Sequence, residues 1–250
     1  MSFTQVTNLL IQHQILRHSP SADLKPDNMM ARLEDKSILE RSATDEFENP
    51  LPQKICDDHT VYLSRNQYGH PTNMAKVLGI ITITDFGFAV HGDGPHYGSI
   101  QVEPFRAPEV ILDAGWSYST DIWNLGLWDL LEEHSLFKAI DRSNTEYDER
   151  THLAYIEALL GPPPKDLLLR GRRSSMFYNS SGQLEPPLDL PVIDFETSIN
   201  QINGEEKRMF IKFVKKMLTW EPKDRQTAKE LLDDPWLHTS FLEENSSHVP

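Results

Sequence analysis

Four stretches in the second half of the sequence carry apolar residues at helical spacing, and they constrain the fold more than any other feature. Apolar side chains recur there at intervals of three and four residues, as on the buried face of an amphipathic helix. Loops bearing Pro and Gly separate the stretches. Only one strand is equally clear, the β-branched run LGIITIT at 78–84. We therefore predict an α+β fold that is mainly α. The helical stretches are 116–134, 152–160, 204–220 and 227–234.

The composition is that of a globular chain with a strong acidic bias. The 250 residues are 38% hydrophobic, enough to bury one sizeable core. Lys and Arg number 24 against 38 for Asp and Glu, so the net charge is -14. This balance argues against nucleic acid or an anionic membrane as the main partner and favours a basic partner. The alternative is that the charge is solvated surface that maintains solubility.

Cysteine usage and hydropathy indicate the compartment. Cys56 is the single cysteine, which excludes an internal disulfide and suits a reducing environment. Residues 1–18 have neither a basic leader nor a continuous apolar core, and no apolar run approaches the ~20 residues of a membrane span. We expect a monomer that is cytoplasmic, nuclear or both.

The first third of the chain divides into a helix, a loop and an insertion. Apolar spacing predicts a helix over 3–17, stopped by Pro20. Residues from about 34 to about 75 are polar, bear Pro and show little periodicity, which indicates a surface insertion. We place the core between residues 3 and 238, followed by a short tail, 239–250.

Five short motifs follow one another in a fixed order. Each occurs by chance in many proteins, but their order and spacing together are informative. The set resembles the C-terminal lobe of a eukaryotic protein kinase, a helical bundle with a small β-hairpin region. The resemblance implies that residues 1–250 are the C-lobe portion of a kinase domain. The motifs are DLKPDN (23–28), DFG (85–87), APE (107–109), DIW (121–123) and PKDR (222–225).

The resemblance implies a site for ATP and Mg²⁺. Asp23 would accept or orient the proton of the substrate hydroxyl, and Lys25 would lie against the γ-phosphate. Asn28 and Asp85 would supply hard oxygen ligands to Mg²⁺, and Lys25, Asn28 and Asp85 together would bind the nucleotide. Met30 falls where this family places an apolar floor beneath adenine; the alternative is a core methionine.

Further residues match structural positions of the family. Glu109 and Arg225 match an ion pair that anchors the activation segment, here Asp85 to Glu109. Asp121 would brace the catalytic loop from the helix below. All three residues would support the site without touching the substrate.

Within the kinases, the sequence is most similar to the SR-protein kinase group, a branch of the CMGC kinases. The similarity rests on SIQVEPFRAPEVILDAGWSYSTDIW (99–123), on residues 148–184 and on the short activation segment. Ala22 agrees with the non-Arg residue that this group carries before its catalytic Asp. The group phosphorylates serines in Arg/Ser-rich proteins, so the resemblance implies a serine/threonine kinase with basic substrates.

The sequence also departs from the kinase pattern. It holds no Gly-rich loop and no V-A-I-K strand before the catalytic loop, so we expect the N-lobe to be absent. Ser19–Ala22 separate His18 from Asp23, where the family has one residue. DIWNLGLWDL (121–130) is two residues short. A non-catalytic, kinase-derived binding module therefore stays open as an alternative. A small-molecule kinase is disfavoured, because APE and the long helical tail belong to kinases of protein substrates.

Two charged stretches have possible roles. RGRR at 170–173 is interpreted as a solvated loop in preference to a nuclear address. The segment 129–149 borders the position where the resembling family holds Arg-rich peptide, and we expect it to attract a basic substrate. The alternative is a solvated acidic loop. Its acidic residues are Asp129, Glu132, Glu133, Asp141, Glu146, Asp148 and Glu149.

Overall fold

The computed structural model describes residues 24–33, 35–63, 78–91, 94–125, 136–137, 146–188, 193–239 and 241. The predicted helix over 3–17, the candidate catalytic residue Asp23 and most of the acidic segment 129–149 lie outside these residues. The chain divides into two compact units, which are described separately. The larger comprises Met1–Met29 and Ile83–Pro250, and the smaller comprises Met30–Thr82.

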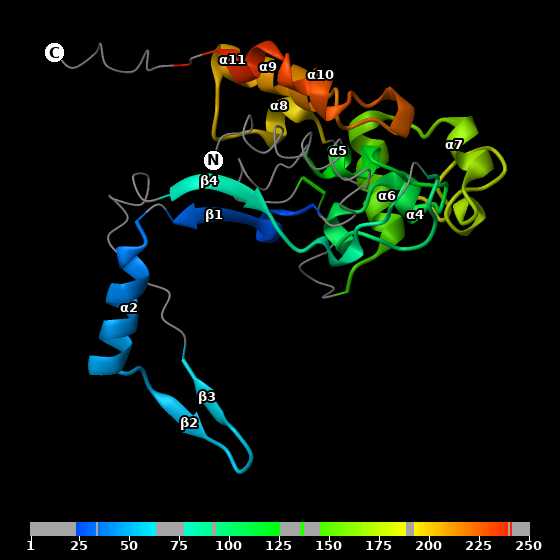
Figure 1. Ribbon diagram of the computed structural model, residues 1–250. Helices are drawn as coiled ribbons and strands as arrows, with labels where there is room; N and C mark the ends of the chain where they lie inside the picture. Colours follow the sequence, from blue (N-terminus) through cyan, green and yellow to red (C-terminus); the bar gives the residue numbers. More distant parts are fainter. Residues whose placement is uncertain are drawn as a thin grey trace. The chain divides into compact units, whose positions relative to one another are not determined.

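The larger unit is built from helices, as the apolar periodicity predicted (Figure 1). Within the part of the chain that the structure describes, no helix is long and apolar enough to cross a membrane. The α-helices are α4 (Pro108–Ile111), α5 (Ser119–Leu125), α6 (Glu149–Leu160), α7 (Lys165–Arg170), α8 (Phe195–Ser198), α9 (Gly204–Val214), α10 (Ala228–Leu232) and α11 (Pro235–His238). The 3-10 helices are η1 (Pro26–Asn28), η2 (Phe86–Phe88), η3 (Glu103–Phe105), η5 (Ser174–Met176) and η6 (Pro222–Asp224).

The smaller unit contains the strands and one helix. The predicted strand is confirmed as β4 (Leu78–Ile83), which pairs with β1 (Met29–Leu33). Strands β2 (Gln53–Ile55) and β3 (Thr60–Tyr62) form an antiparallel hairpin with Lys54 opposite Val61. Helix α2 (Ser37–Glu48) lies within the region that we interpreted as an insertion with little periodicity. Ile38 is the one buried residue of α2, and the other large apolar side chains of this helix, Leu39 and Phe47, are exposed.

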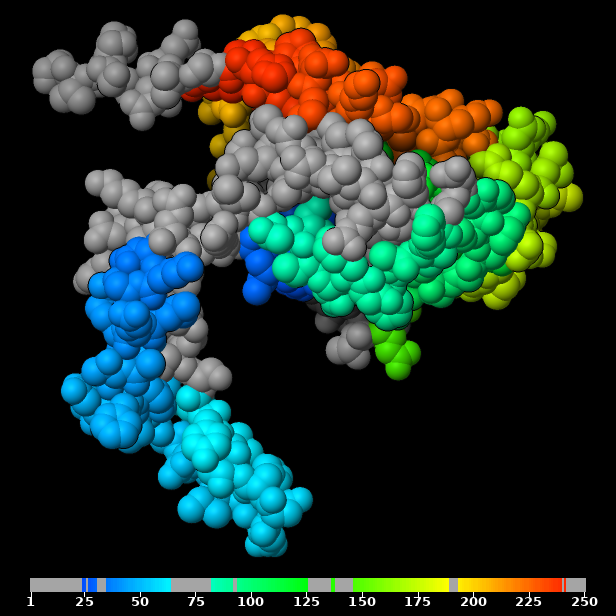
Figure 2. Space-filling view, viewed as in Figure 1, coloured from blue at the N-terminus to red at the C-terminus, as the bar shows by residue number. Residues whose placement is uncertain are grey.

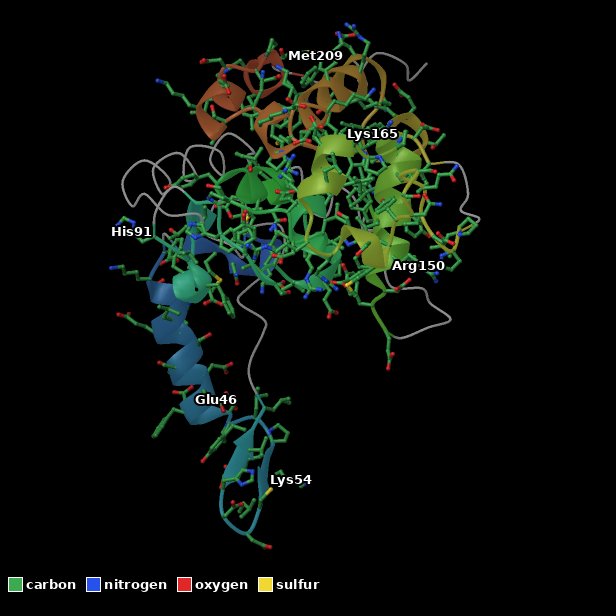
Figure 3. All side chains as sticks on the ribbon, turned by 90° about the vertical axis from the view of Figure 1, so that its right-hand side faces the viewer. Glu46, Lys54, His91, Arg150, Lys165 and Met209 are labelled. Carbon is green, nitrogen blue, oxygen red and sulfur yellow. The ribbon has the colours of Figure 1, made fainter. Side chains whose placement is uncertain are left out.

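Apolar side chains fill the space between the helices of the larger unit (Figure 3). Helices α9 and α11 pack through three aromatic rings: the ring centroid of Trp236 lies 4.9 Å from that of Phe210 and 5.1 Å from that of Phe213. Helix α10 begins with a capping box, in which the side chains of Thr227 and Glu230 each accept a hydrogen bond from the backbone N–H of the other residue. These contacts fix the C-terminal helices as one block.

The arginines of RGRR make contacts within the fold, while Arg170 and Arg172 stay exposed at the end of α7 and in the turn that follows it. Arg170 donates to both carboxylate oxygens of Glu221, at 3.1 and 2.6 Å. Arg173 makes a bidentate pair with Glu149. The guanidinium of Arg172 lies 3.5 Å from the ring centroid of Tyr97. Because these partners are distant in sequence, the local pattern could not identify them.

One buried ion pair links three parts of the larger unit. Arg225 donates to the two carboxylate oxygens of Glu109, both at 2.6 Å, and both side chains are 0% exposed. The remaining N–H groups of Arg225 bond the carbonyls of Ser119 (2.8 Å) and Thr219 (3.1 and 3.2 Å). All five guanidinium donors are therefore satisfied. The pair that the resemblance predicted joins the end of the activation segment to α5 and to the loop after α9.

Removing one partner of this pair should be far more costly than removing both. Glu109→Gln leaves a buried cation without its counter-ion, and we expect the free energy of unfolding to fall by about 3–5 kcal/mol. The double variant Glu109→Leu/Arg225→Met should lose less than the sum of the single variants. Urea denaturation followed by circular dichroism measures this. Glu205→Gln, which breaks an exposed pair with Arg208 on α9, is the control with little expected loss. Additive single losses at 109 and 225 would contradict the coupling.

Candidate active site

The loop that carries the candidate catalytic residues is held from below by α5. Leu24 is fully buried, and its carbonyl accepts a hydrogen bond of 2.7 Å from the side-chain amide of Asn124. The following turn, η1, starts at Pro26 and closes through a bond of 3.0 Å from the Asn28 N–H to the Lys25 carbonyl. Proline is common at the first position of such a turn because its ring fixes φ near the helical value. These hydrogen bonds hold the loop from Leu24 to Asn28 in position.

The end of strand β4 lies against this loop. Thr84 donates its backbone N–H (2.8 Å) and its hydroxyl (3.1 Å) to the carbonyl of Asn28. Asp85, the next residue, is exposed and adopts a left-handed conformation with φ 58° and ψ 63°. Asp tolerates this region better than most residues, and such conformations occur preferentially at functional sites. The structure therefore brings Asn28 and Asp85 together, from sequence positions more than fifty residues apart.

The two residues offer the ligands that Mg²⁺ prefers. An amide oxygen and a carboxylate oxygen are both hard donors, and Mg²⁺ in phosphoryl-transfer sites takes one or two protein ligands plus phosphate oxygens and water. Among the described residues, no group of three or more His, Cys, Asp or Glu side chains could hold a metal ion. A pair of ligands completed by a nucleotide fits this arrangement, whereas a closed metal site with protein ligands alone does not.

The other candidate residues are placed as follows. Lys25 is half-buried within the loop, and Asn28 is 7% exposed. Met30 belongs to the smaller unit, where it lies on β1 with 57% of its surface exposed. Its assignment to an adenine floor stays a prediction. Asp121 is fully buried on α5, the helix that supports the loop. Asp23 falls outside the described residues, so its catalytic role also stays a prediction.

Gln101 is a supporting residue that the sequence reasoning missed. Its side chain is 9% exposed and donates to the Thr120 carbonyl (3.2 Å) and to Oδ1 of Asn124 (2.9 Å). Its own amide oxygen accepts the N–H of Ala107 at 2.9 Å. Asn124 therefore bonds the candidate catalytic loop at Leu24 with its side-chain nitrogen and Gln101 with its side-chain oxygen. A buried amide has no periodic signature, so only the structure identifies this link.

The middle of the activation segment is fastened to the loop that follows α4. His96 and Trp116 exchange two backbone hydrogen bonds of 2.9 Å. The Gly98 N–H donates to Asp113 at 3.0 Å, and the Gly98 carbonyl accepts the Trp116 indole N–H at 3.2 Å. The stacking of Arg172 on Tyr97 lies beside these contacts. In Figure 2 this part of the chain, teal to green, lies on the surface toward the viewer.

A cluster around Arg106 holds the end of the segment. The Arg106 guanidinium lies 3.5 Å from the carboxylate of Glu149 and 5.3 Å from the ring centroid of Tyr147. The Tyr147 hydroxyl lies 3.0 Å from Nδ1 of His152, which is fully buried on α6. Burial raises the pKa of the Tyr147 hydroxyl above its ordinary value. Burial, together with the positive charge of Arg106, lowers the pKa of His152 from 6.5 to about 3. The tyrosine thus stays protonated and the imidazole stays neutral.

Comparison with known proteins identifies the family to which this fold and this site belong. The family model "Protein kinase domain" matches residues 66–237, more than half of the chain, and the chain belongs to that family. The matched residues include Asp85, Glu109 and Arg225, whereas the loop 24–28 precedes them.

Several curated kinases are similar to the chain. A serine/threonine protein kinase of Aspergillus fumigatus is 40% identical over 205 residues, which are 81% of this chain and 51% of that protein. The serine/threonine-protein kinase SKY1 of Saccharomyces cerevisiae is 33% identical, over 66% of this chain and 23% of that protein. The dual specificity protein kinase CLK1 of Homo sapiens is 32% identical, over 62% and 32%. The chain thus spans about half the length of the Aspergillus relative and less of the others.

A solved kinase domain shares the fold. It superimposes with a TM-score of 0.64 at 22% sequence identity, and the match covers 94% of this chain and 64% of that domain. At this identity the likeness concerns the fold alone.

The buried imidazole should make stability depend on pH. In the unfolded chain His152 takes up a proton as the pH falls below 6.5, whereas in the folded chain it does so only near 3. The unfolded state therefore binds more protons in this window, and stability is lost as the pH falls from 6.5 toward 3. Well below pH 6.5, His152 should lower the free energy of unfolding by up to about 1.4 kcal/mol for each further pH unit.

The matched variant is His152→Asn, because an Asn oxygen can accept the Tyr147 hydroxyl in place of Nδ1. Chemical denaturation at several pH values between about 7 and about 4.5 should give a flatter dependence for the variant than for the native protein. Equal slopes would show that His152 is protonated in the folded state or is accessible to water.

Proposed function

We propose that this chain provides the C-terminal, catalytic part of a serine/threonine protein kinase of the SR-protein kinase type. The reaction transfers the γ-phosphate of ATP to serines of Arg/Ser-rich proteins. The observation that carries the proposal is the adjacency of Asn28 and Asp85, through the two hydrogen bonds of Thr84, on a loop that Asn124 connects to the activation segment.

Each residue then has a chemical role. Asp23 accepts the proton of the serine hydroxyl or orients that hydroxyl toward phosphorus. Lys25 places a positive charge where negative charge gathers on the transferred group. Asn28 and Asp85 would hold Mg²⁺, which when bound neutralises the phosphate oxygens of the nucleotide. The rigid hydrogen bonding of Leu24 and Asn28 maintains these groups in position, because catalysis of phosphoryl transfer depends chiefly on geometry.

Two features support a basic protein substrate. The first feature is the similarity of residues 99–123 and 148–184 to the SR-protein kinase group. The second is the net charge of -14. Within the acidic segment 129–149, the described residues differ in whether their carboxylates could contact a basic substrate. Asp148 caps α6 through the N–H of Thr151, and Glu149 pairs with Arg173. Glu146 is exposed, and its carboxylate makes no ion pair with a described residue. Glu146 is therefore the candidate contact.

A non-catalytic binding module is the second candidate. It is favoured by the four residues Ser19–Ala22 between His18 and Asp23, because a displacement of about 1 Å at the catalytic group can cost on the order of 10²-fold in rate. Both candidates would use the same activation segment to hold a peptide. Only the kinase would transfer phosphate to that peptide, so a measurement of phosphorylation distinguishes the two functions.

Substitution of Asp23 and Asp85 in the full-length protein separates the two roles. Asp23→Ala should lower turnover by about 10²- to 10⁴-fold while nucleotide affinity stays nearly unchanged, since this Asp acts on the hydroxyl. Asp85→Ala should abolish Mg²⁺-dependent nucleotide binding. Peptide phosphorylation and calorimetric titration of ATP, with and without Mg²⁺, are the measurements. Circular dichroism controls for folding, and equal loss of both functions in both folded variants would contradict the assignment.

Peptide binding tests the substrate class without requiring turnover. The 250-residue chain should bind an Arg/Ser-repeat peptide more tightly than a Lys/Ser peptide of equal charge, because guanidinium pairs with carboxylates bidentately. Affinity should fall steeply between about 50 and about 300 mM salt. Glu146→Gln should weaken binding about two- to fivefold, whereas Glu48→Gln on α2 should not. Fluorescence anisotropy measures all three effects, and indifference to salt and peptide type would remove the support for basic substrates.

A further inference from the structure

Helix α2 exposes a row of apolar side chains. Leu39, Ala43 and Phe47 are spaced four residues apart, so they lie on one face of the helix, called the apolar row below. All three are exposed, Leu39 to 54% and Phe47 to 89%. Ile38 belongs to the neighbouring row, which is buried or half-buried along its length. The apolar row is therefore not the face through which α2 attaches to its own unit.

The burial that normally stabilises a short helix is small in α2. A helix of 12 residues is marginal in water unless tertiary contacts bury one of its faces. Ile38 is the one buried residue. At the start of the helix, Ser37 donates to Asp35 (3.0 and 2.6 Å) and Arg41 donates to Ser37 at 2.8 Å. These bonds support only the first turn, so a partner that covers the apolar row would supply the burial that the rest of the helix lacks.

The charges of α2 are arranged against its dipole. The C-terminal end of a helix carries partial negative charge, which favours cations. The last turn of α2 instead contains Asp45, Glu46 and Glu48 and has no basic residue; Glu46 is labelled at this end in Figure 3. A positive group bound there would relieve the repulsion. A local conflict of this kind is expected at a surface that serves binding.

Carboxylates also border the apolar row. Glu40 and Glu48 each follow a residue of that row by one position, and they form the adjacent row with Thr44 between them. Both glutamates are exposed, and neither makes an ion pair with another residue that the structure describes. The surface thus combines an apolar centre with an acidic border.

This combination distinguishes between possible partners. A second copy would place one acidic α2 against another, between two chains that each have a net charge of -14. An anionic membrane would be repelled for the same reason. An amphipathic helix whose apolar face is bordered by Lys or Arg complements both parts of the surface.

We propose that α2 is a docking surface for a basic amphipathic helix of another protein. The apolar side chains of the partner would cover Leu39, Ala43 and Phe47, and its basic side chains would face Glu40 and Glu48. The proposal uses no residue of the candidate active site, so it does not depend on phosphoryl transfer. An Arg/Ser-repeat peptide has no apolar face and should not occupy this surface.

Three synthetic helical peptides of about 16 residues test the proposal against the 250-residue chain. The basic peptide has Leu on one face and Lys along both borders of that face. The acidic peptide has Glu in place of each Lys. The scrambled peptide keeps the composition of the basic one, but its Leu residues no longer share a face. Fluorescence anisotropy gives Kd for each peptide.

The protein variants are Phe47→Ser and the double variant Glu40→Lys/Glu48→Lys. The matched control is Leu169→Ser, which replaces an apolar side chain on α7 that is 84% exposed. Circular dichroism verifies that each variant is folded. Sedimentation of the native chain and of Phe47→Ser measures whether this surface joins two copies.

We expect the native chain to bind the basic peptide at least about tenfold more tightly than the acidic or the scrambled peptide. Phe47→Ser should weaken this binding about tenfold, because it removes the largest apolar contact. Glu40→Lys/Glu48→Lys should weaken binding of the basic peptide about three- to tenfold and strengthen binding of the acidic peptide. Leu169→Ser should bind as the native chain does.

Four results would overturn the proposal. Equal affinity for the basic and scrambled peptides would show attraction by net charge alone. Unchanged binding in both folded α2 variants would place the peptide elsewhere. Absence of binding by the native chain would show that the surface accepts no such helix. A dimer that Phe47→Ser dissociates would identify a second copy as the occupant.

Discussion

The ion pair between Arg225 and Glu109 is the interaction on which the larger unit depends. Both groups are fully buried, so each charge is tolerable only because the other is present. Arg225 also bonds the first residue of α5 and the loop after α9. A substitution of either partner would affect the end of the activation segment, the start of α5 and the loop after α9 together. The pair therefore determines where the activation segment ends and where α5 begins.

From this anchor, a continuous hydrogen-bonded path leads to the candidate catalytic loop. Glu109 ends the APE motif, and Ala107 of the same motif donates to Gln101. Gln101 bonds Asn124, which bonds the carbonyl of Leu24. Every group on this path is buried, so each unmade bond would cost about 1–3 kcal/mol. Stability and the geometry of the site are consequently maintained by the same residues.

The sequence predicted features with a local or repeated signature, and it missed those that depend on distant partners. Strand β4 follows from a β-branched run, and helices α6 and α9 follow from apolar spacing. The pair of Glu109 and Arg225 was predicted only by resemblance to kinases. Helix α2 was not predicted because eight of its twelve residues are polar or charged, so the segment resembles a polar insertion. The supporting role of Gln101 was not predicted, because a single buried amide leaves no periodic pattern in the sequence. Asp23 and Met30 stay predictions, since no geometry described above tests their roles.

The distribution of charge in the larger unit strengthens the case for a cationic partner beyond the net charge. Six of the seven arginines that the structure describes in this unit each contact a carboxylate of the same chain. Each of these ion pairs has little net field at a distance, whereas Glu103 and Glu146 are exposed and make no ion pair with another described residue. The potential around the activation segment should therefore be more negative than a uniform spread of the charges would give. A cationic peptide would be concentrated near the very loop that α5 maintains in position. The six arginines are Arg106, Arg170, Arg172, Arg173, Arg208 and Arg225.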